Sequence, residues 1–172
     1  MMRRAIATAL AACLAAGPLA PFGAGAAEPT AIATYRDWNV FVREIEGDKI
    51  CFAATDAKDK SPKSVNHGDV FFLVATWKSG AAKNQPSLMT GYNLKDEPEP
   101  TVRIGSDKWE MYVSGMEAFI ESPGEEARLI TAMRRGSDMR ISAVSTRGTA
   151  TSYVMSLLGV SAALDRVAKA CR

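Results

Sequence analysis

Two cysteines, Cys51 and Cys171, remain in the chain once its first 26 residues are set aside as an export signal. They lie near opposite ends of what is left, and an exported chain folds where thiols oxidise, so we expect them to form a disulfide. Such a bridge would join the last helix to an early strand. A redox-active dithiol is the alternative, but redox sites favour close spacing such as Cys-x-x-Cys, and this pair is far apart.

The export signal is predicted from the first 26 residues. A short basic start with Arg3 and Arg4 precedes an apolar run, rich in alanine and leucine, over residues 5–20. This run is too short for a stable membrane span. Small residues then lead up to Ala26, after which we expect cleavage, with Ala27 as the alternative one residue later. Cys13 suggests a lipid-modified N-terminus instead, but the residues that follow it stay apolar.

Cleavage after Ala26 would leave 146 of the 172 residues, the size of one domain. We expect a flexible lead-in over residues 27–34 and a single domain over residues 35–172. The whole chain has 21 Lys and Arg against 19 Asp and Glu, and loss of Arg3 and Arg4 makes the remainder 19 against 19. A neutral chain without a basic run interleaved with aromatic residues predicts no nucleic-acid partner. No second apolar segment is long enough to span a bilayer, so we expect a mature protein that is soluble or peripherally attached. The export signal predicts a periplasmic location, with association with the outer membrane or the cell surface as an alternative.

Short segments of alternating polarity indicate a mainly β fold. The strongest is residues 69–79, where both alternating sets of side chains are apolar, a pattern typical of a strand covered on both faces. Further strands are predicted over 38–43, 49–55, 88–94, 101–104, 108–114, 138–146 and 149–158, with a loop over 56–68. The number and spacing of these strands favour a β-sandwich with a helix against it.

Two helices interrupt this pattern. Residues 125–135 have acids in the first turn, Arg134 and Arg135 in the last, and Gly136 after the end, which is the order that a helix dipole favours. Residues 161–170 form the last helix, whose apolar stripe includes Cys171. Cys51 lies on the face of its strand that is opposite the more apolar one. The sulfurs of Cys51 and Cys171 can therefore meet if the last helix covers the face that carries Cys51.

His67 is the one histidine of the chain, and it lies near Asp69 in a polar loop. It is a candidate general base with a serine nucleophile, but no Gly-x-Ser-x-Gly elbow is present, and a polar turn before a strand is the simpler interpretation. We therefore predict no catalytic residues and expect a protein that is not an enzyme.

Metal and cofactor sites are not predicted either. One histidine and two paired cysteines cannot supply a zinc or copper site. Glu97 and Glu99 could bind a hard cation weakly, but solvated surface acids explain them as well. Trp38, Trp77 and Trp109 suggest a ligand-stacking pocket, yet each lies among apolar strand residues, which favours core packing.

Several motifs resemble, in order and spacing, the invasion-associated locus B family of exported Gram-negative proteins. These motifs are Asp37-Trp38-Asn39-Val40, Lys49-Ile50-Cys51, Gly91-Tyr92, residues 129–136 (LITAMRRG), Arg147-Gly148-Thr149 and the stretch 153–171. The resemblance implies an immunoglobulin-like β-sandwich, a periplasmic or outer-membrane-associated location and no established catalytic residues. In some pathogens the family has a role in host-cell entry, which does not transfer automatically.

Three functions are compatible with the sequence. The first is a non-enzymatic envelope protein that binds an envelope or host protein or another envelope component, using the edges and loops of its sandwich. The second is a small periplasmic enzyme or ligand carrier that uses His67 or a Trp-lined pocket. The third is a structural or stress-related envelope factor without a stable partner. We expect the first.

Overall fold

The computed structural model describes residues 28–172 of the chain. The predicted export signal, the cleavage after Ala26 and the alternative role of Cys13 lie outside these described residues, as does residue 27, the first of the expected lead-in. Residues 30–34 of that lead-in are not irregular. From Thr30 it forms a strand that pairs with the next one, because its side chains partly pack against the core.

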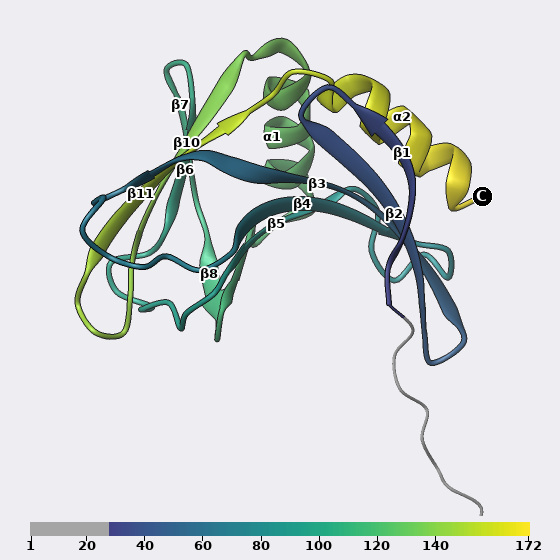
Figure 1. Ribbon diagram of the computed structural model, residues 1–172. Coiled ribbons are helices and arrows are strands. Elements are labelled where there is room, and N and C mark those ends of the chain that lie inside the picture. The colour runs from purple at the N-terminus through teal and green to yellow at the C-terminus, as the bar shows by residue number, and fades with distance from the viewer. Residues whose placement is uncertain (1–27) are drawn as a thin grey trace, which may run out of the picture.

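The described chain contains eleven strands and two helices (Figure 1). The strands are β1 (Thr30–Tyr35), β2 (Trp38–Ile45), β3 (Asp48–Ser61), β4 (Val70–Trp77), β5 (Gln85–Thr90), β6 (Thr101–Ile104), β7 (Asp107–Glu110), β8 (Tyr112–Ser114), β9 (Glu117–Phe119), β10 (Asp138–Val144) and β11 (Ala150–Ser156). The helices are α1 (Pro123–Arg135) and α2 (Val160–Ala170). The mainly β class, a helix before the last two strands and a C-terminal helix are thus confirmed.

The strands form one antiparallel sheet in the order β7-β6-β10-β11-β3-β4-β5-β9-β8, with β2 and β1 attached beside β3. Its two end strands, β7 and β8, are separated in the chain by Met111 alone, so the sheet is nearly closed. The expected immunoglobulin-like sandwich of two separate sheets is not confirmed.

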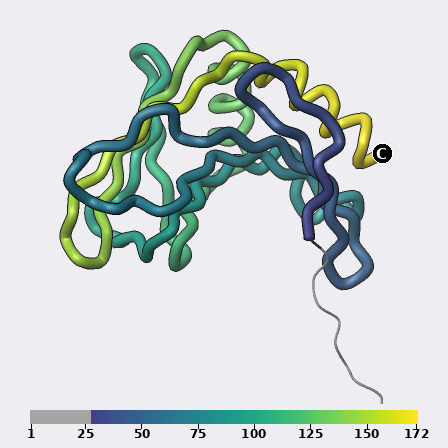
Figure 2. Tube along the Cα trace, in the orientation of Figure 1, coloured from purple at the N-terminus to yellow at the C-terminus, as the bar shows by residue number. Residues whose placement is uncertain are grey.

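The long strand β3 makes the sheet continuous. Its first half pairs with β2 and β4, and its second half pairs with β11. Figure 2 shows this stretch running from the hairpin near the C-terminus to the opposite end of the molecule. The loop predicted over residues 56–68 is therefore wrong up to Ser61. Lys58, Asp59 and Lys60 are consecutive charged residues, which is typical of a loop, yet Asp59 and Lys60 pair with Val154 and Tyr153 of β11.

The helix ends follow local rules. Ser122 caps α1, where its hydroxyl accepts a hydrogen bond from the Glu125 amide, and Gly136 ends the helix. The last helix begins at Val160, one residue before the predicted start, and Gly159 in a left-handed conformation precedes it. Both helices bury apolar side chains in the core: Leu129 and Met133 from α1, and Leu164 and Val167 from α2.

The two faces of the sheet differ in what covers them. The inner face carries the side chains that join the single core cluster, including Val40, Ala53, Phe72 and Val74, and both helices contribute to this cluster. The outer face carries the alternating set, and none of its side chains belongs to the cluster. The strand over residues 69–79, expected to be covered on both faces, is therefore covered on one.

Candidate functional site

The outer face of β2, β3, β4, β5 and β9 is rich in apolar side chains that lie outside the core cluster. Cross-strand partners in an antiparallel sheet project to the same side, so the register defines its members. The same face carries the buried Ile50 and Ala54. Its other apolar members are Phe41, Phe52, Phe71, Leu73, Ala75, Trp77, Met89 and Phe119. Each is partly exposed rather than buried. We refer to this set as the apolar outer face.

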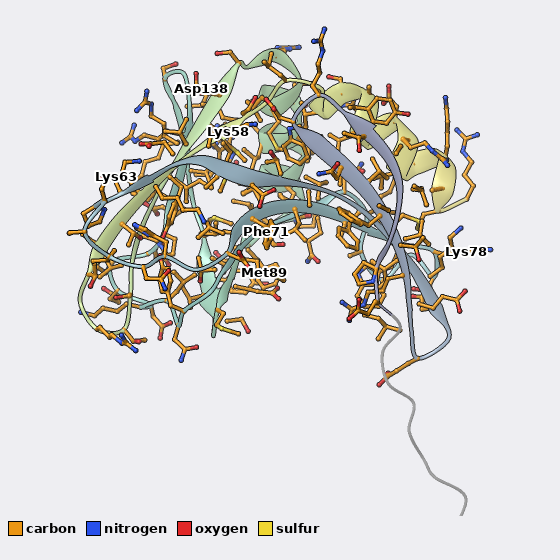
Figure 3. The ribbon with its side chains drawn as sticks, viewed as in Figure 1. Lys58, Lys63, Phe71, Lys78, Met89 and Asp138 are labelled. Carbon is orange, nitrogen blue, oxygen red and sulfur yellow. A yellow bond between two sulfur atoms is a disulfide. The ribbon has the colours of Figure 1, made fainter. Side chains whose placement is uncertain are left out.

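Aromatic side chains of the apolar outer face contact one another across strands. The rings of Phe41 and Phe52 stack with their centroids 5.2 Å apart. Phe119 stacks on Tyr112 of β8 at 5.6 Å, and Tyr112 is 45% exposed. Figure 3 shows Phe71 and Met89 next to each other below the central strands, on the side away from α2. Contiguous exposed apolar surface of this kind marks interaction sites in soluble proteins.

Charged residues lie at the corners of the apolar outer face: Arg43 at one corner, Glu117 at the diagonally opposite one, and Asp56 on β3 at the same end as Glu117. Arg43 on β2 is the cross-strand partner of Ile50, and Glu117 on β9 is the partner of Met89. The Arg43 Nε is buried and has no hydrogen-bond partner in the described part of the chain. Burial raises the pKa of the Glu117 carboxyl, which forms no ion pair with any residue of 28–172. The Arg43 guanidinium and the Glu117 carboxylate would each be stabilised by a partner that places an oppositely charged group beside it.

The predicted disulfide joins Cys51 and Cys171, whose Cα atoms are 5.8 Å apart. Cys51 lies on the inner face, opposite the more apolar set of Ile50, Phe52 and Ala54, as the strand pattern predicts. The bridge attaches α2 to β3 on that face, and Lys49 Nζ donates to the Ala170 carbonyl at 2.6 Å. The disulfide thus keeps the last helix on one side of the sheet and away from the apolar outer face.

His67 is buried, and both of its ring nitrogens have partners. Nε2 lies 2.9 Å from the carbonyl oxygen of Pro62, which only accepts, so this nitrogen carries the hydrogen. Nδ1 lies 3.1 Å from the hydroxyl of Tyr153, which donates to it when the ring is neutral. Asp69 forms no hydrogen bond with His67 in the described structure. The arrangement anchors a loop and leaves the ring no free lone pair to act as a base.

Tyr153 continues this chain of hydrogen bonds into the sheet. Its hydroxyl oxygen accepts from Tyr92 at 2.5 Å, and the Tyr92 hydroxyl meets Thr151 Oγ1 at 2.8 Å. Burial raises the pKa of the Tyr153 phenol, which therefore remains a neutral donor. Gly68 and Gly91 pack closely enough to bring the His67 loop against Tyr92, since a Cβ added at Gly91 would lie 3.3 Å from the Gly68 Cα.

A hollow of about 560 Å³ opens beside His67. Its lining includes Val65, Tyr92, Met116 and Arg147, and Val65 and Met116 are exposed apolar side chains. This hollow is a place beside His67 where a small ligand could sit. The sequence did not predict the Tyr92–Tyr153–His67 chain, because these residues are far apart in the chain and meet only through tertiary contacts.

The three tryptophans do not line one pocket. Trp38 is fully buried, and its indole donates to the Ser156 carbonyl at 3.0 Å. Trp109 is buried beneath Arg128, whose guanidinium carbon lies 4.1 Å from the ring centroid. Core packing is confirmed for these two. Trp77 differs, because it lies on the apolar outer face and is partly exposed.

Glu97 and Glu99 are exposed, and Glu99 borders a shallow hollow shared with β10 and β11. Across residues 28–172, no group of three or more His, Cys, Asp or Glu side chains is arranged to hold a metal ion. No helix among the described residues is long and apolar enough to cross a membrane.

Taken together, these features define a disulfide-bonded, mainly β protein with helices on one face of a nearly closed sheet and an apolar surface on the other. Residues 38–168 match the family described as Invasion associated locus B (IalB) protein. The match covers well over half of the chain, and the chain belongs to this family. Searches of curated proteins and of solved structures gave no match.

Proposed function

We propose that this chain is an exported, non-enzymatic protein of the cell envelope that binds another envelope protein through its apolar outer face. The observation that carries the proposal is a continuous set of partly exposed aromatic and aliphatic side chains on five neighbouring strands, outside the core cluster. An exported chain that keeps such a surface bare risks aggregation, so a partner that covers it is the simplest reason for its existence.

The corner charges specify the chemistry of that partner. A surface that covers the apolar outer face would bury Arg43 and Glu117 further, which is unfavourable unless each is paired. We therefore expect the partner to present apolar side chains flanked by a carboxylate opposite Arg43 and a basic group opposite Glu117. Location in the periplasm, or in association with the outer membrane, would give access to such partners. A role in host-cell contact is a special case that also requires display at the cell surface.

The alternative, an enzyme or ligand carrier at His67, has one supporting observation, the adjacent hollow of about 560 Å³. Both ring nitrogens of His67 are occupied by Pro62 and Tyr153, which argues against a general base there. A Trp-lined pocket has no support, since Trp38 and Trp109 are core residues.

The test places a photo-crosslinking amino acid at Met89, on the apolar outer face, or at Arg147, which borders the His67 hollow, in the exported full-length protein. Crosslinking in living cells should give one defined product from position 89 and none from position 147. Leu73→Ser should abolish the product, and Val65→Ser, the matched control beside the His67 hollow, should not.

Three outcomes would contradict the proposal. A defined product from position 147 that Val65→Ser removes would identify the His67 hollow as the binding site. The absence of a defined product at both positions would leave the apolar outer face without a partner. A product of twice the mass of the chain, with no second protein in it, would replace an envelope partner with a second copy of this chain.

A further inference from the structure

A row of basic side chains crosses the sheet at the end opposite α2. Arg103 on β6 is the cross-strand partner of Lys108 on β7 and of Arg140 on β10. Directly opposed residues project to the same side with their Cβ atoms about 5 Å apart. All three side chains are exposed. Three adjacent strands therefore present three positive charges side by side, an arrangement that is normally destabilising.

Carboxylates only partly neutralise this row. Lys108 Nζ lies 2.9 Å from Glu110, whereas Arg140 Nε reaches Asp138 only at 4.0 Å. Arg103 has no carboxylate within 4.0 Å in the part of the chain described by the structure. The middle of the row is thus its least compensated position.

Arg103 and Arg140 border a hollow of about 960 Å³ between α1 and the ends of β6 and β10. Figure 1 shows α1 beside these strands, and Figure 3 marks Asp138 at the start of β10. Arg135, in the last turn of α1, lines the same hollow and forms no ion pair with residues of the described chain.

Acids in the hollow are fewer than the bases. Arg128 also lines it, but its guanidinium bonds to Glu125 at 2.6 Å and lies over Trp109. Asp107 lies 3.8 Å from Arg128. Apart from Arg128 and Asp107, the charged residues that line the hollow are Arg103, Arg135 and Arg140, with Asp138 as the one acid among them.

We propose that this hollow binds a phosphate dianion, as a phosphomonoester or diphosphate group on a larger molecule. Guanidinium groups match phosphate oxygens with paired N–H donors, and Arg103 and Arg140 can offer two such forks from neighbouring strands. Arg135 adds a third positive charge from α1. A bound dianion would reduce the repulsion among the positive charges of the row. We therefore expect the folded protein to be more stable with the ligand than without it. The proposal does not rest on the apolar outer face, which lies on other strands.

The test measures binding of inorganic pyrophosphate to the full chain by titration calorimetry at low ionic strength. We expect one saturable site that weakens as salt is added. Arg103→Gln with Arg140→Gln should weaken binding at least tenfold. The matched control, Arg147→Gln with Lys83→Gln, removes the same charge from exposed positions outside the hollow and should leave binding unchanged.

A second measurement separates a ligand site from a merely basic surface. Without ligand, Arg103→Gln should raise Tm, because it removes the like charge from the centre of the row. Pyrophosphate should raise Tm of the wild type and not of the double variant. Absence of binding, or equal loss in both double variants, would overturn the proposal, as would a fall in Tm on Arg103→Gln.

Vesicles identify the source of the phosphate. Binding to phosphatidic acid vesicles, but not to phosphatidylcholine vesicles, with the same dependence on Arg103 and Arg140, would indicate a lipid phosphomonoester. Binding of pyrophosphate alone would indicate a soluble phosphorylated compound. Vesicle binding that is unaffected by the Arg103→Gln and Arg140→Gln double variant would contradict the assigned site.

Discussion

Cys51 is fully buried beneath α2, so its bridge to Cys171 holds a helix that would otherwise be attached only by packing and a few polar contacts, such as that of Lys49 with the Ala170 carbonyl. The two residues are 120 positions apart. In the chain-entropy model, closing a loop of this length stabilises the folded protein by roughly 4–5 kcal/mol. We expect Cys51→Ser or Cys171→Ser to lower Tm of the oxidised protein substantially. Wild-type protein whose thiols label freely, with Tm equal to that of the variants, would contradict this.

Glu117 gives the described chain a pH dependence with a defined sign. Burial raises the pKa of its carboxyl above the ordinary value of 4.5. A raised pKa means that the folded state binds the proton more tightly, so the stabilising contribution is complete below pH 4.5 and is lost as pH rises through the folded pKa. Glu117→Gln should therefore raise Tm by a few degrees at pH 7 and leave it unchanged at pH 4.

Glu110 is the control for this experiment. Its hydrogen bond to Lys108 lowers the pKa of its carboxyl, so Glu110→Gln should not raise Tm at pH 7. Thermal melts of both variants at the two pH values are sufficient. If Glu117→Gln is stabilising to the same extent at pH 4, the effect arises from something other than ionisation of this side chain.

At the scale of elements, the attachment of α2 depends on Gly159 as well as on the disulfide. Gly159 has φ 95°, and a Cβ added there would lie 2.0 Å from the Tyr35 carbonyl oxygen. Gly159→Ala should cost more than about 2 kcal/mol of unfolding free energy, since it combines an unfavourable left-handed conformation with a backbone clash.

Gly148 provides the matched comparison. It has φ 85° and open space around its Cα, so Gly148→Ala tests the conformation without the clash. Chemical denaturation should show a clearly smaller loss for Gly148→Ala than for Gly159→Ala. Equal losses would mean that the backbone of Tyr35 moves away easily and that β1 does not fix the start of α2.

The elements that the sequence predicted well are those whose signals are local. The Glu-rich start and Arg-rich end of α1, the apolar stripe of α2 and the face of β3 that carries Cys51 follow from spacing and charge order. The second half of β3 could not be predicted in this way. Its partner strand β11 lies about ninety residues later, and pairing at that distance leaves no signal in the local pattern.

The candidate site shows the same division. Counting cysteines is enough to predict the disulfide. The side chains of the apolar outer face are also visible in the sequence, but their pattern predicted a strand that is buried on both faces. Apolar side chains occupy both sets of positions in β4, a pattern typical of a strand that is covered on both faces. The isolated chain covers one of them. The discrepancy between pattern and burial at Phe71 and Leu73 is itself the strongest argument for a partner.

At the scale of the whole molecule, this asymmetry can be tested with two neighbouring residues of β4. Phe72 is fully buried in the core, and Phe71 projects from the other face and is partly exposed. Phe72→Ala should lower the unfolding free energy by about 3–5 kcal/mol, the usual cost of removing a buried aromatic ring. Phe71→Ala should cost about 1 kcal/mol or less in the purified chain, yet it should weaken crosslinking to the envelope partner in cells. A large stability loss from Phe71→Ala would instead mean that the apolar outer face is part of the core of the isolated protein and is not free for binding.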